Sequence, residues 1–245
     1  MITSIQNEQV KQWRKLHKRK FRMKMKKFLI EGFHLIEEAF NSGWEVETVI
    51  AQEGVNPPDW MSDDGITIVN ERVFNEITQT ETPQGIAAIV KMKDLPVRTD
   101  NFILLIDAIQ DPGNLGTIIR TADAAGFSQI VLGTGTVDVY NDKVIRASQG
   151  SLFHISIKQA NLLQAIDELK KENYTIYASA LRNAINYNDV EIESKVALIV
   201  GNEGAGISEE ILNVADKIVK IPIYGQAESL NVSIAAGILM YKMRN

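Results

Sequence analysis

The sequence contains no cysteine and only three histidines and six prolines among its 245 residues. The missing thiol excludes disulfides, thiolate zinc sites and a cysteine nucleophile. His17, His34 and His154 are too scattered to suggest a metal centre, so we expect no metal. No apolar run approaches the ~20 residues that a membrane-spanning helix needs, and the first residues lack the apolar stretch of a secretory signal. We therefore expect a cytoplasmic protein with no membrane partner.

The remaining composition is that of an ordinary globular protein. Hydrophobic residues make up 45% of the chain and charged residues 23%, values typical of folded domains. The length allows one large domain or two small ones. Because cysteine is absent and histidine is scarce, any catalysis must depend on Asn, Arg, Glu and Ser side chains, on backbone amides and on a bound cofactor.

Charge is distributed unevenly along the chain. The formal net charge is -5, yet residues 11–27 contain ten Lys and Arg residues and no acidic residue, while the rest of the chain has 16 basic and 31 acidic residues. A positive band of this kind suits phosphate groups, and the rings of Trp13 and Phe21 within it are suited to stacking on bases. A solvated helix face explains a basic run taken alone equally well.

The chain divides near residue 95. Residues 1–92 show short alternating elements. The stretch 93–101 is polar, contains Pro96 and lacks periodicity, which predicts a linker. We therefore expect one domain over residues 1–95 and a second over 101–245. The elements predicted for the first are helices near 6–20 and at 32–41 and 71–77, and strands at 28–30, 46–51, 66–69 and 86–92.

The second half follows a different pattern, with longer strand–helix units. Strands alternating with helices predict an α/β domain with a parallel sheet covered on both faces. The predicted strands are 102–106, 129–132, 154–157, 175–180, 196–200 and 218–221, and the predicted helices are 115–125, 161–172, 208–215 and the C-terminal segment. His154 begins an apolar strand, which favours a histidine buried in the core.

Three loops at strand ends contain the candidate chemistry. In the first, residues 107–126, Asn114 stands where a helix cap is expected and Arg120 follows nearly two turns later. The second, 198–208, has the glycine spacing G-x-x-G-x-G, which is not the G-x-G-x-x-G of a dinucleotide site. In the third, 221–237, Ser229 and Asn231 are placed to cap the last helix. Taken singly, each loop is equally explained by capping, turn formation and helix packing.

Taken together and in this order, these loops resemble a known family. The stretches DPGNLGTIIRTADAAGF (111–127), IVGNEGAGIS (199–208) and IPIYGQAESLNVSIAAG (221–237), with KVIRASQGSLFH (143–154), are similar to the motifs of the SPOUT superfamily, specifically the SpoU-type RNA ribose 2′-O-methyltransferases. The stretch KKFLIEGFHLIEEAF (26–40) more loosely resembles a ribosomal-protein-like RNA-binding domain.

The resemblance implies a fold, a reaction and partners. The second domain is expected to form a trefoil knot that binds S-adenosylmethionine, preceded by a small N-terminal α/β RNA-binding domain, and the protein is expected to be a homodimer. The implied reaction transfers a methyl group to a ribose 2′-hydroxyl in RNA, with large-subunit (23S) ribosomal RNA favoured. The alternatives are a tRNA ribose 2′-O-methyltransferase and a non-catalytic RNA-binding or ribosome assembly factor.

The resemblance also implies roles for individual residues. Because a guanidinium does not lose its proton in a protein, Arg120 is expected to bind a phosphate and stabilise the developing alkoxide. The expected catalytic set is Arg120, Asn114, Glu203, Ser229 and Asn231. The expected cofactor-binding set is Gly201, Ile221, Leu230, Gly133 and Thr134. The expected RNA-binding set is Arg14, Lys15, Lys18, Arg19, Lys20, Arg22, Arg146 and Ser148.

Overall fold

A computed structural model describes residues 1–58, 60–61, 65–96 and 101–244. The chain forms two compact units: Met1–Lys93 with Tyr140–Phe153, and Asp94–Val139 with His154–Asn245. This division differs in one segment from the two consecutive domains expected from the sequence, because residues 140–153 pack with the first unit. Of the predicted linker, residues 97–100 lie outside the described residues.

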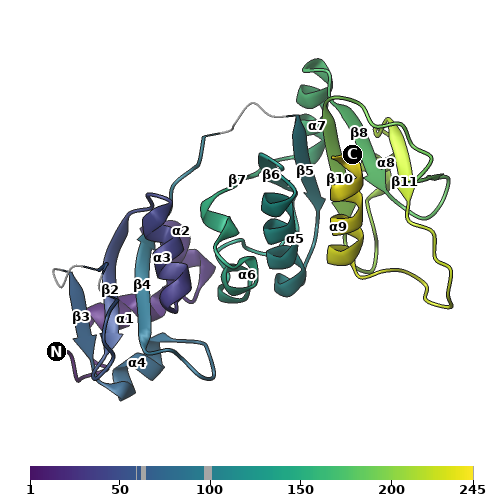
Figure 1. The fold of residues 1–245 in the computed structure, drawn as a ribbon. Coiled ribbons are helices and arrows are strands. Elements are labelled where there is room, and N and C mark those ends of the chain that lie inside the picture. Colours follow the sequence, from purple (N-terminus) through teal and green to yellow (C-terminus); the bar gives the residue numbers. More distant parts are fainter. Residues whose placement is uncertain (59, 62–64, 97–100, 245) are drawn as a thin grey trace. The chain divides into compact units, whose positions relative to one another are not determined.

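The first unit is built on a four-stranded mixed sheet (Figure 1). The strand order is β1-β4-β2-β3, and only the β2–β3 pair is parallel. Two helices pack on one face, where Trp13, Phe74 and Ile77 join Ile50 in a single apolar cluster. The strands are β1 (Lys27–Glu31), β2 (Val46–Gln52), β3 (Ile66–Val69) and β4 (Ile86–Lys91), and the two helices are α1 (Glu8–Lys15) and α4 (Glu71–Ile77).

The basic segment forms two helices where the sequence predicted one. A turn at residues 16–18 separates α1 from α2 (Arg19–Met25), which ends at Lys26 with a φ of 54°. Trp13 is only 7% exposed, so the prediction that its ring stacks on bases is wrong. The apolar face of α1 needs a large side chain to fill the space above the sheet, and Trp13 supplies it.

The other face of β1 supports an aromatic cluster. Phe28 contacts the rings of Trp44, Tyr140 and Phe153 at centroid distances of 5.9, 4.6 and 6.4 Å. The Trp44 indole N–H also donates to the Phe153 carbonyl at 3.1 Å. These contacts explain why segment 140–153 belongs to the first unit. The helices here are α3 (Phe33–Asn41), α6 (Asp142–Ser148) and the short 3-10 helix η1 (Ser151–Phe153).

The second unit contains a seven-stranded sheet in the order β7-β6-β5-β10-β8-β11-β9. Every pair in it is parallel, which confirms the predicted sheet, although β7 begins two residues later than predicted and β9 was not predicted. The strands are β5 (Phe102–Asp107), β6 (Gln129–Leu132), β7 (Ser156–Gln159), β8 (Thr175–Ser179), β9 (Ile185–Asn186), β10 (Val196–Gly201) and β11 (Lys217–Lys220).

Helices cover both faces of this sheet. Ile103, Leu105 and Ile199 pack with Ile166 and Ile211 from α7 (Leu162–Lys171) and α8 (Glu209–Leu212). Because side chains alternate along a strand, the intervening strand residues face the opposite side. There α9 (Val232–Met243) packs on β10 and beside α5 (Pro112–Ala124) (Figure 1). Within the described residues, no helix has the length and apolar character to cross a bilayer.

Candidate active site

The parallel sheet brings three loops to one edge. Since β5, β6, β10 and β11 run in the same direction, the loops that follow them emerge together, which is where α/β sheets bind ligands. In the β5–β10 register, Gly201 lies opposite Asp107. The Asp107 carboxylate accepts from the Ser208 N–H at 2.8 Å, and the Asn202 side-chain amide donates to the Ala108 carbonyl at 2.8 Å. The first and second loops are therefore fastened together.

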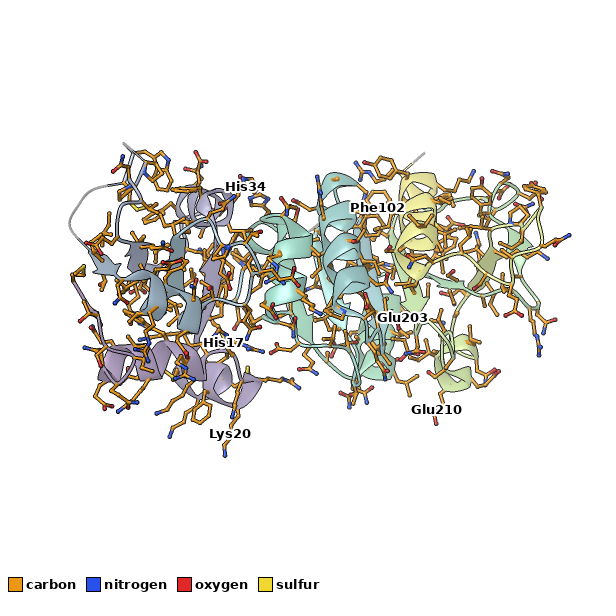
Figure 2. The ribbon with its side chains drawn as sticks, turned by 90° about the horizontal axis from the view of Figure 1, so that it is seen from below. His17, Lys20, His34, Phe102, Glu203 and Glu210 are labelled. Atoms are coloured by element: carbon orange, nitrogen blue, oxygen red, sulfur yellow. The ribbon has the colours of Figure 1, made fainter. Side chains whose placement is uncertain are left out.

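Glu203 occupies the centre of this arrangement, beside the beginning of α5 (Figure 2). Its carboxylate accepts from the N–H groups of Gln110 and Asp111 at 3.2 and 3.0 Å, and from the Asn114 side-chain amide at 3.1 Å. Partial burial alone would raise the pKa of Glu203, but the hydrogen bonds from Asp111, Asn114, Gln110 and its own N–H outweigh it and lower the pKa. Glu203 is therefore an ionised acceptor at neutral pH.

A second hydrogen bond joins the third loop to the first. The Asn231 side-chain N–H donates to the Asn114 side-chain oxygen at 2.9 Å. The Asn231 oxygen in turn accepts from the N–H and the hydroxyl of Ser233 at 2.9 and 2.6 Å. A continuous series of hydrogen bonds thus crosses all three loops and joins Glu203, Asn114 and Asn231, which the family resemblance assigned to one site. Their catalytic role stays a prediction.

The structure confirms Asn231 as the cap of α9 but contradicts the other two predicted caps, Asn114 and Ser229. Asp111, not Asn114, caps α5, because its carboxylate accepts from the Asn114 N–H at 2.7 Å. Pro112 occupies the first helical position, which places the cap directly before it. Asn231 alone caps α9, so the prediction of a Ser229 cap is wrong. Because Asp111 caps the helix, the Asn114 side chain is left to hydrogen-bond with Glu203 and Asn231.

Arg120 and Ser229 do not join this network. Arg120 is exposed on α5, and its side chain has no hydrogen-bond or ion-pair partner among the residues that the structure describes. Ser229 is exposed in the loop before α9. The arrangement therefore contains a fixed part, built on two asparagines and Glu203, and a free cationic side chain on the same helix as Asn114.

The residues expected to bind the cofactor lie at the same sheet edge. Gly133 follows β6, Gly201 ends β10 and Ile221 follows β11. A side chain at Gly201 would collide with the backbone of Gly206 and Ile207, and the Gly133 N–H donates to the Ile106 carbonyl at 2.8 Å. The two glycines therefore let the loops close tightly.

The third loop offers backbone groups to a ligand. Within the described chain, the N–H and C=O groups of residues 223–230 have no hydrogen-bond partner. Residues 224–230 are exposed, so these backbone groups are open to solvent and accessible to a ligand. Tyr224 is 90% exposed and Leu230 is 37% exposed in the same loop, and Thr134 is exposed after β6. Free amide groups beside apolar side chains fit the edge and faces of a nucleoside such as that of S-adenosylmethionine.

The residues expected to bind RNA divide into two groups. Arg14, Lys15, Lys18, Arg19 and Lys20 are exposed on α1, on α2 and in the turn between them. Figure 2 marks Lys20 among them. Their exposed positions form a basic surface, in which the Arg14 guanidinium also lies 3.2 Å from the Glu76 carboxylate.

Arg22 and Ser148 are buried. The Arg22 side chain donates to the carbonyls of Leu16 and His17 at 2.7 and 2.8 Å and so holds the α1–α2 turn. The Ser148 hydroxyl donates to the Ile145 carbonyl at 2.8 Å. The structure therefore does not present these two predicted residues to an RNA. Arg146 is partly exposed and pairs with Asp142 at 2.8 Å.

Two further observations correct or extend the sequence analysis. The His154 side chain is 40% exposed and lies 3.1 Å from Asp123, so the prediction of a core histidine is wrong: the strand begins only at Ser156. Asn202, which the sequence analysis did not select, accepts from the N–H groups of Gly204 and Ala205 at 2.9 Å. An Asn directly before a glycine-rich turn is the signal that points to this role. No cluster of metal-ligating side chains occurs in the described part of the chain.

Comparison with known proteins places the chain in a family. Residues 101–241 match the SpoU rRNA Methylase family, and residues 7–88 match the MRM3-like substrate binding domain. The fold and the three-loop site are thus those of an RNA methylase, and the chain belongs to the SpoU rRNA methylase family.

Individual relatives resemble it over nearly the whole length. It is 47% identical, over 99% of this chain and 98% of the relative, to the 23S rRNA (guanosine(2553)-2′-O)-methyltransferase RlmP of Bacillus subtilis. The AdoMet-bound rRNA methyltransferase from Sinorhizobium meliloti superposes with a TM-score of 0.88 at 32% identity, covering 99% of this chain and 96% of that one. The methyltransferase AviRb from Streptomyces viridochromogenes, solved with AdoMet, gives 0.88 at 27% identity, covering 98% and 97%.

Proposed function

We propose that this protein methylates a ribose 2′-hydroxyl of large-subunit (23S) ribosomal RNA, with S-adenosylmethionine as the methyl donor. The observation that carries the proposal is the Glu203–Asn114–Asn231 chain, which fastens three family motifs into one site at the carboxyl edge of the sheet. The choice of ribosomal RNA follows the Bacillus subtilis relative, which is named for that substrate. A ribosomal RNA substrate also supports a cytoplasmic location.

The cofactor is expected at the edge formed after β6, β10 and β11. S-adenosylmethionine supplies, when bound, an electrophilic methyl group. The unpaired backbone groups of residues 223–230 would hold it, together with Gly133, Thr134, Gly201, Ile221 and Leu230. We further propose that the chain here is threaded as the trefoil knot that the family resemblance implies.

The protein side chains then have separate tasks. Asn114 and Asn231 have their amide groups fixed by hydrogen bonds to neighbours, so they position whatever the site binds at no further ordering cost. Arg120, the free cation on α5, is suited to bind a phosphate of the RNA and to stabilise negative charge that develops on the 2′-oxygen. A guanidinium keeps its proton, so Arg120 is an electrostatic catalyst and not a base.

Two surfaces support the proposed partners. The exposed cations of α1 and α2 suit the RNA phosphates, since neutralised phosphates release counterions and strengthen binding. The helix α9 exposes Ile234 at 55% and Tyr241 at 52%, with Leu230 directly before it. A spacing of seven residues places Ile234 and Tyr241 on one face of the helix. An apolar stripe of this kind supports a homodimer formed through α9.

The decisive experiment maps ribose methylation in total RNA from cells with and without the gene. Loss of one methylated site in 23S ribosomal RNA is the expected result. Loss of a methylated site in tRNA would show that the substrate is tRNA. If no methylated site is lost, the enzymatic proposal is contradicted. Calorimetry with S-adenosylmethionine distinguishes an enzyme from a non-catalytic RNA-binding or assembly factor, because such a factor has no need to bind the methyl donor.

A further inference from the structure

A cavity of about 220 Å³ lies within the first unit and shares no residue with the three catalytic loops. Its wall comes from the end of β1, the first turn of α3, the segment 80–84 before β4 and the C-terminal part of α6. Besides Glu31, the polar residues that line it are His34, Thr80, Thr82, Gln84, Arg146 and Gln149. His34 is marked on the surface of this unit in Figure 2.

Hydrogen bonds hold this wall in shape. The Glu31 carboxylate accepts from the N–H groups of Gln79 and Thr80 at 2.8 and 3.3 Å. The Gln84 side-chain oxygen accepts from the Phe33 N–H at 3.0 Å, which ties segment 80–84 to the beginning of α3. The imidazole of His34 lies 3.3 Å from the Gln149 carbonyl. A cavity whose wall is fixed in advance binds a ligand without a large ordering cost.

The lining offers both donors and acceptors. With its oxygen occupied, Gln84 keeps its side-chain NH₂ group for a ligand, and no partner for that group occurs among the described residues. Gln149 donates its NH₂ group to the Arg146 carbonyl at 2.8 Å, which leaves its side-chain oxygen as an acceptor. The Thr80 hydroxyl is buried without a hydrogen-bond partner in the described chain. Leu35 and Pro83 supply apolar surface.

Charge and size restrict the ligand. The lining carries one cation, Arg146, and one anion, Glu31, and the guanidinium of Arg146 is already paired with Asp142. A nearly neutral wall suits a neutral heteroaromatic group better than a phosphate. The volume is below the roughly 300–1,000 Å³ of pockets for drug-sized ligands, and it suits a group of the size of one nucleobase.

We propose that this cavity binds one unstacked base of the substrate RNA. The proposal rests on the proposed function, which makes RNA the substrate. Proteins that recognise RNA sequence bind bases splayed out of single-stranded segments and hydrogen-bond their edges. The segments that supply eight of the ten lining residues lie within the part of the chain that matches the MRM3-like substrate binding domain. The cavity thus selects RNA by base, while the basic helices bind phosphates.

The test uses the full chain and an abasic scan. A synthetic ribosomal RNA fragment that contains the mapped methylation site is made in versions that each lack one base, and each Kd is measured by fluorescence anisotropy. Thr82→Trp fills the cavity from an exposed position, and Gln84→Ala removes the amide without adding bulk. Gln164→Ala, an exposed change on α7, is the matched control. Thermal unfolding verifies that each variant folds.

The expected result is one position outside the methylated nucleotide at which a missing base weakens binding to the unaltered protein about tenfold, the effect of losing one base contact. That penalty disappears in Thr82→Trp, shrinks in Gln84→Ala and persists in Gln164→Ala. An unchanged abasic profile in Thr82→Trp and Gln84→Ala would overturn the proposal while leaving methylation of the fragment, and so the proposed function, intact. A free nucleoside monophosphate that binds as tightly as the RNA, and only to the unfilled cavity, would also overturn it.

Discussion

At the scale of single residues, the site depends on side chains that are held by hydrogen bonds within the protein. Asn114 donates to Glu203 and accepts from Asn231, so its rotamer is fixed before any ligand arrives. Arg120 stands apart as a cation without a partner in the described chain. This contrast separates residues that shape the site from one that is free to contact substrate.

Replacing Arg120 with lysine tests its proposed role. Lysine keeps the charge but lacks the planar fork that binds a phosphate through two N–H groups. We expect the single-turnover rate constant for methyl transfer to fall about 100-fold, as for loss of one preorganised donor to a developing anion, with the Kd for S-adenosylmethionine unchanged. Single-turnover methylation and calorimetry measure the two quantities. Arg72→Lys, an exposed change on α4, is the control, and near-normal turnover by Arg120→Lys would refute the role.

The lowered pKa of Glu203 predicts a pH dependence of stability. The carboxylate is stabilised in the folded state, so its contribution to the free energy of unfolding is present above its ordinary pKa of about 4.5 and is lost as pH falls through the lower folded value. Glu203→Gln removes this contribution. We expect the difference between the two proteins to be constant above pH 5 and to shrink at lower pH in denaturant titrations. A difference between the two proteins that is independent of pH would contradict this explanation.

At the scale of elements, the carboxyl ends of β5 and β10 decide how the loops close. Gly201 and Asp107 lie opposite each other, and the second loop folds back so that Asn202 and Gly206 pair. The backbone of Gly206 and Ile207 therefore lies where a side chain on residue 201 would project. The requirement for glycine is steric at this position.

Gly201→Ala should therefore destabilise the protein. Overpacking of a closed structure costs about 1–3 kcal/mol, and the displaced second loop should also weaken S-adenosylmethionine binding. Urea unfolding and calorimetry measure both effects. Gly225→Ala is the matched control for stability, because an added Cβ there meets nothing within 4 Å. Equal stability of the two variants would show that the second loop can move to accommodate a side chain at residue 201, which would contradict the steric requirement for glycine.

The exposed stripe on α9 gives a prediction for assembly. Tyr241→Asp places a charge on this stripe, and burying an unpaired charge in an interface is unfavourable. We expect the variant to be a monomer and the unaltered protein a dimer in sedimentation-velocity experiments. Leu163→Asp introduces the same charge at an exposed apolar position on α7 and should leave the dimer intact. A Tyr241→Asp dimer would exclude this face as the interface.

At the scale of the whole molecule, charge is segregated along an acidic chain. Ten cations fall within residues 11–27 of a protein whose net charge is -5. The structure leaves most of them exposed on α1 and α2 and uses Arg22 to brace the turn between these helices. The rest of the chain is acidic and therefore repels RNA. Attraction to RNA phosphates is thus confined to the basic surface of the first unit.

This arrangement predicts a steep salt dependence of RNA binding. Each phosphate contact adds about 0.7–0.9 to the slope of log K against log salt. Changing Lys15, Lys18 and Lys20 together to Gln should therefore lower the slope by about 2. Filter binding over a salt series measures it. The control changes Lys170, Lys171 and Lys195 to Gln, at the end of α7 and directly before β10. A flat salt response of the unaltered protein would contradict the proposed surface.

The sequence by itself determined the parallel sheet, six of its seven strands to within two residues and the positions of the three loops, because buried strands and glycine-rich turns impose local patterns that a single chain displays. It did not reveal β9. The resemblance of these loops to the family motifs selected Asn114, Glu203 and Asn231. The sequence placed the cap of α9 at Asn231 correctly, but it misplaced the cap of α5, added a cap at Ser229 and misjudged the exposure of His154 and Trp13. The exact start of an element and the burial of a side chain depend on neighbours distant in sequence.

Only the tertiary structure decided how those residues combine. The hydrogen bonds from Asn114 to Glu203 and from Asn231 to Asn114 span 89 and 117 residues of chain, and no local pattern encodes such pairings. The same holds for segment 140–153, which packs on Phe28 through aromatic contacts, and for the cavity beside His34. Contacts of this range arise when strands fix the positions of loop ends, so they depend on the assembled sheets and not on any one stretch of sequence.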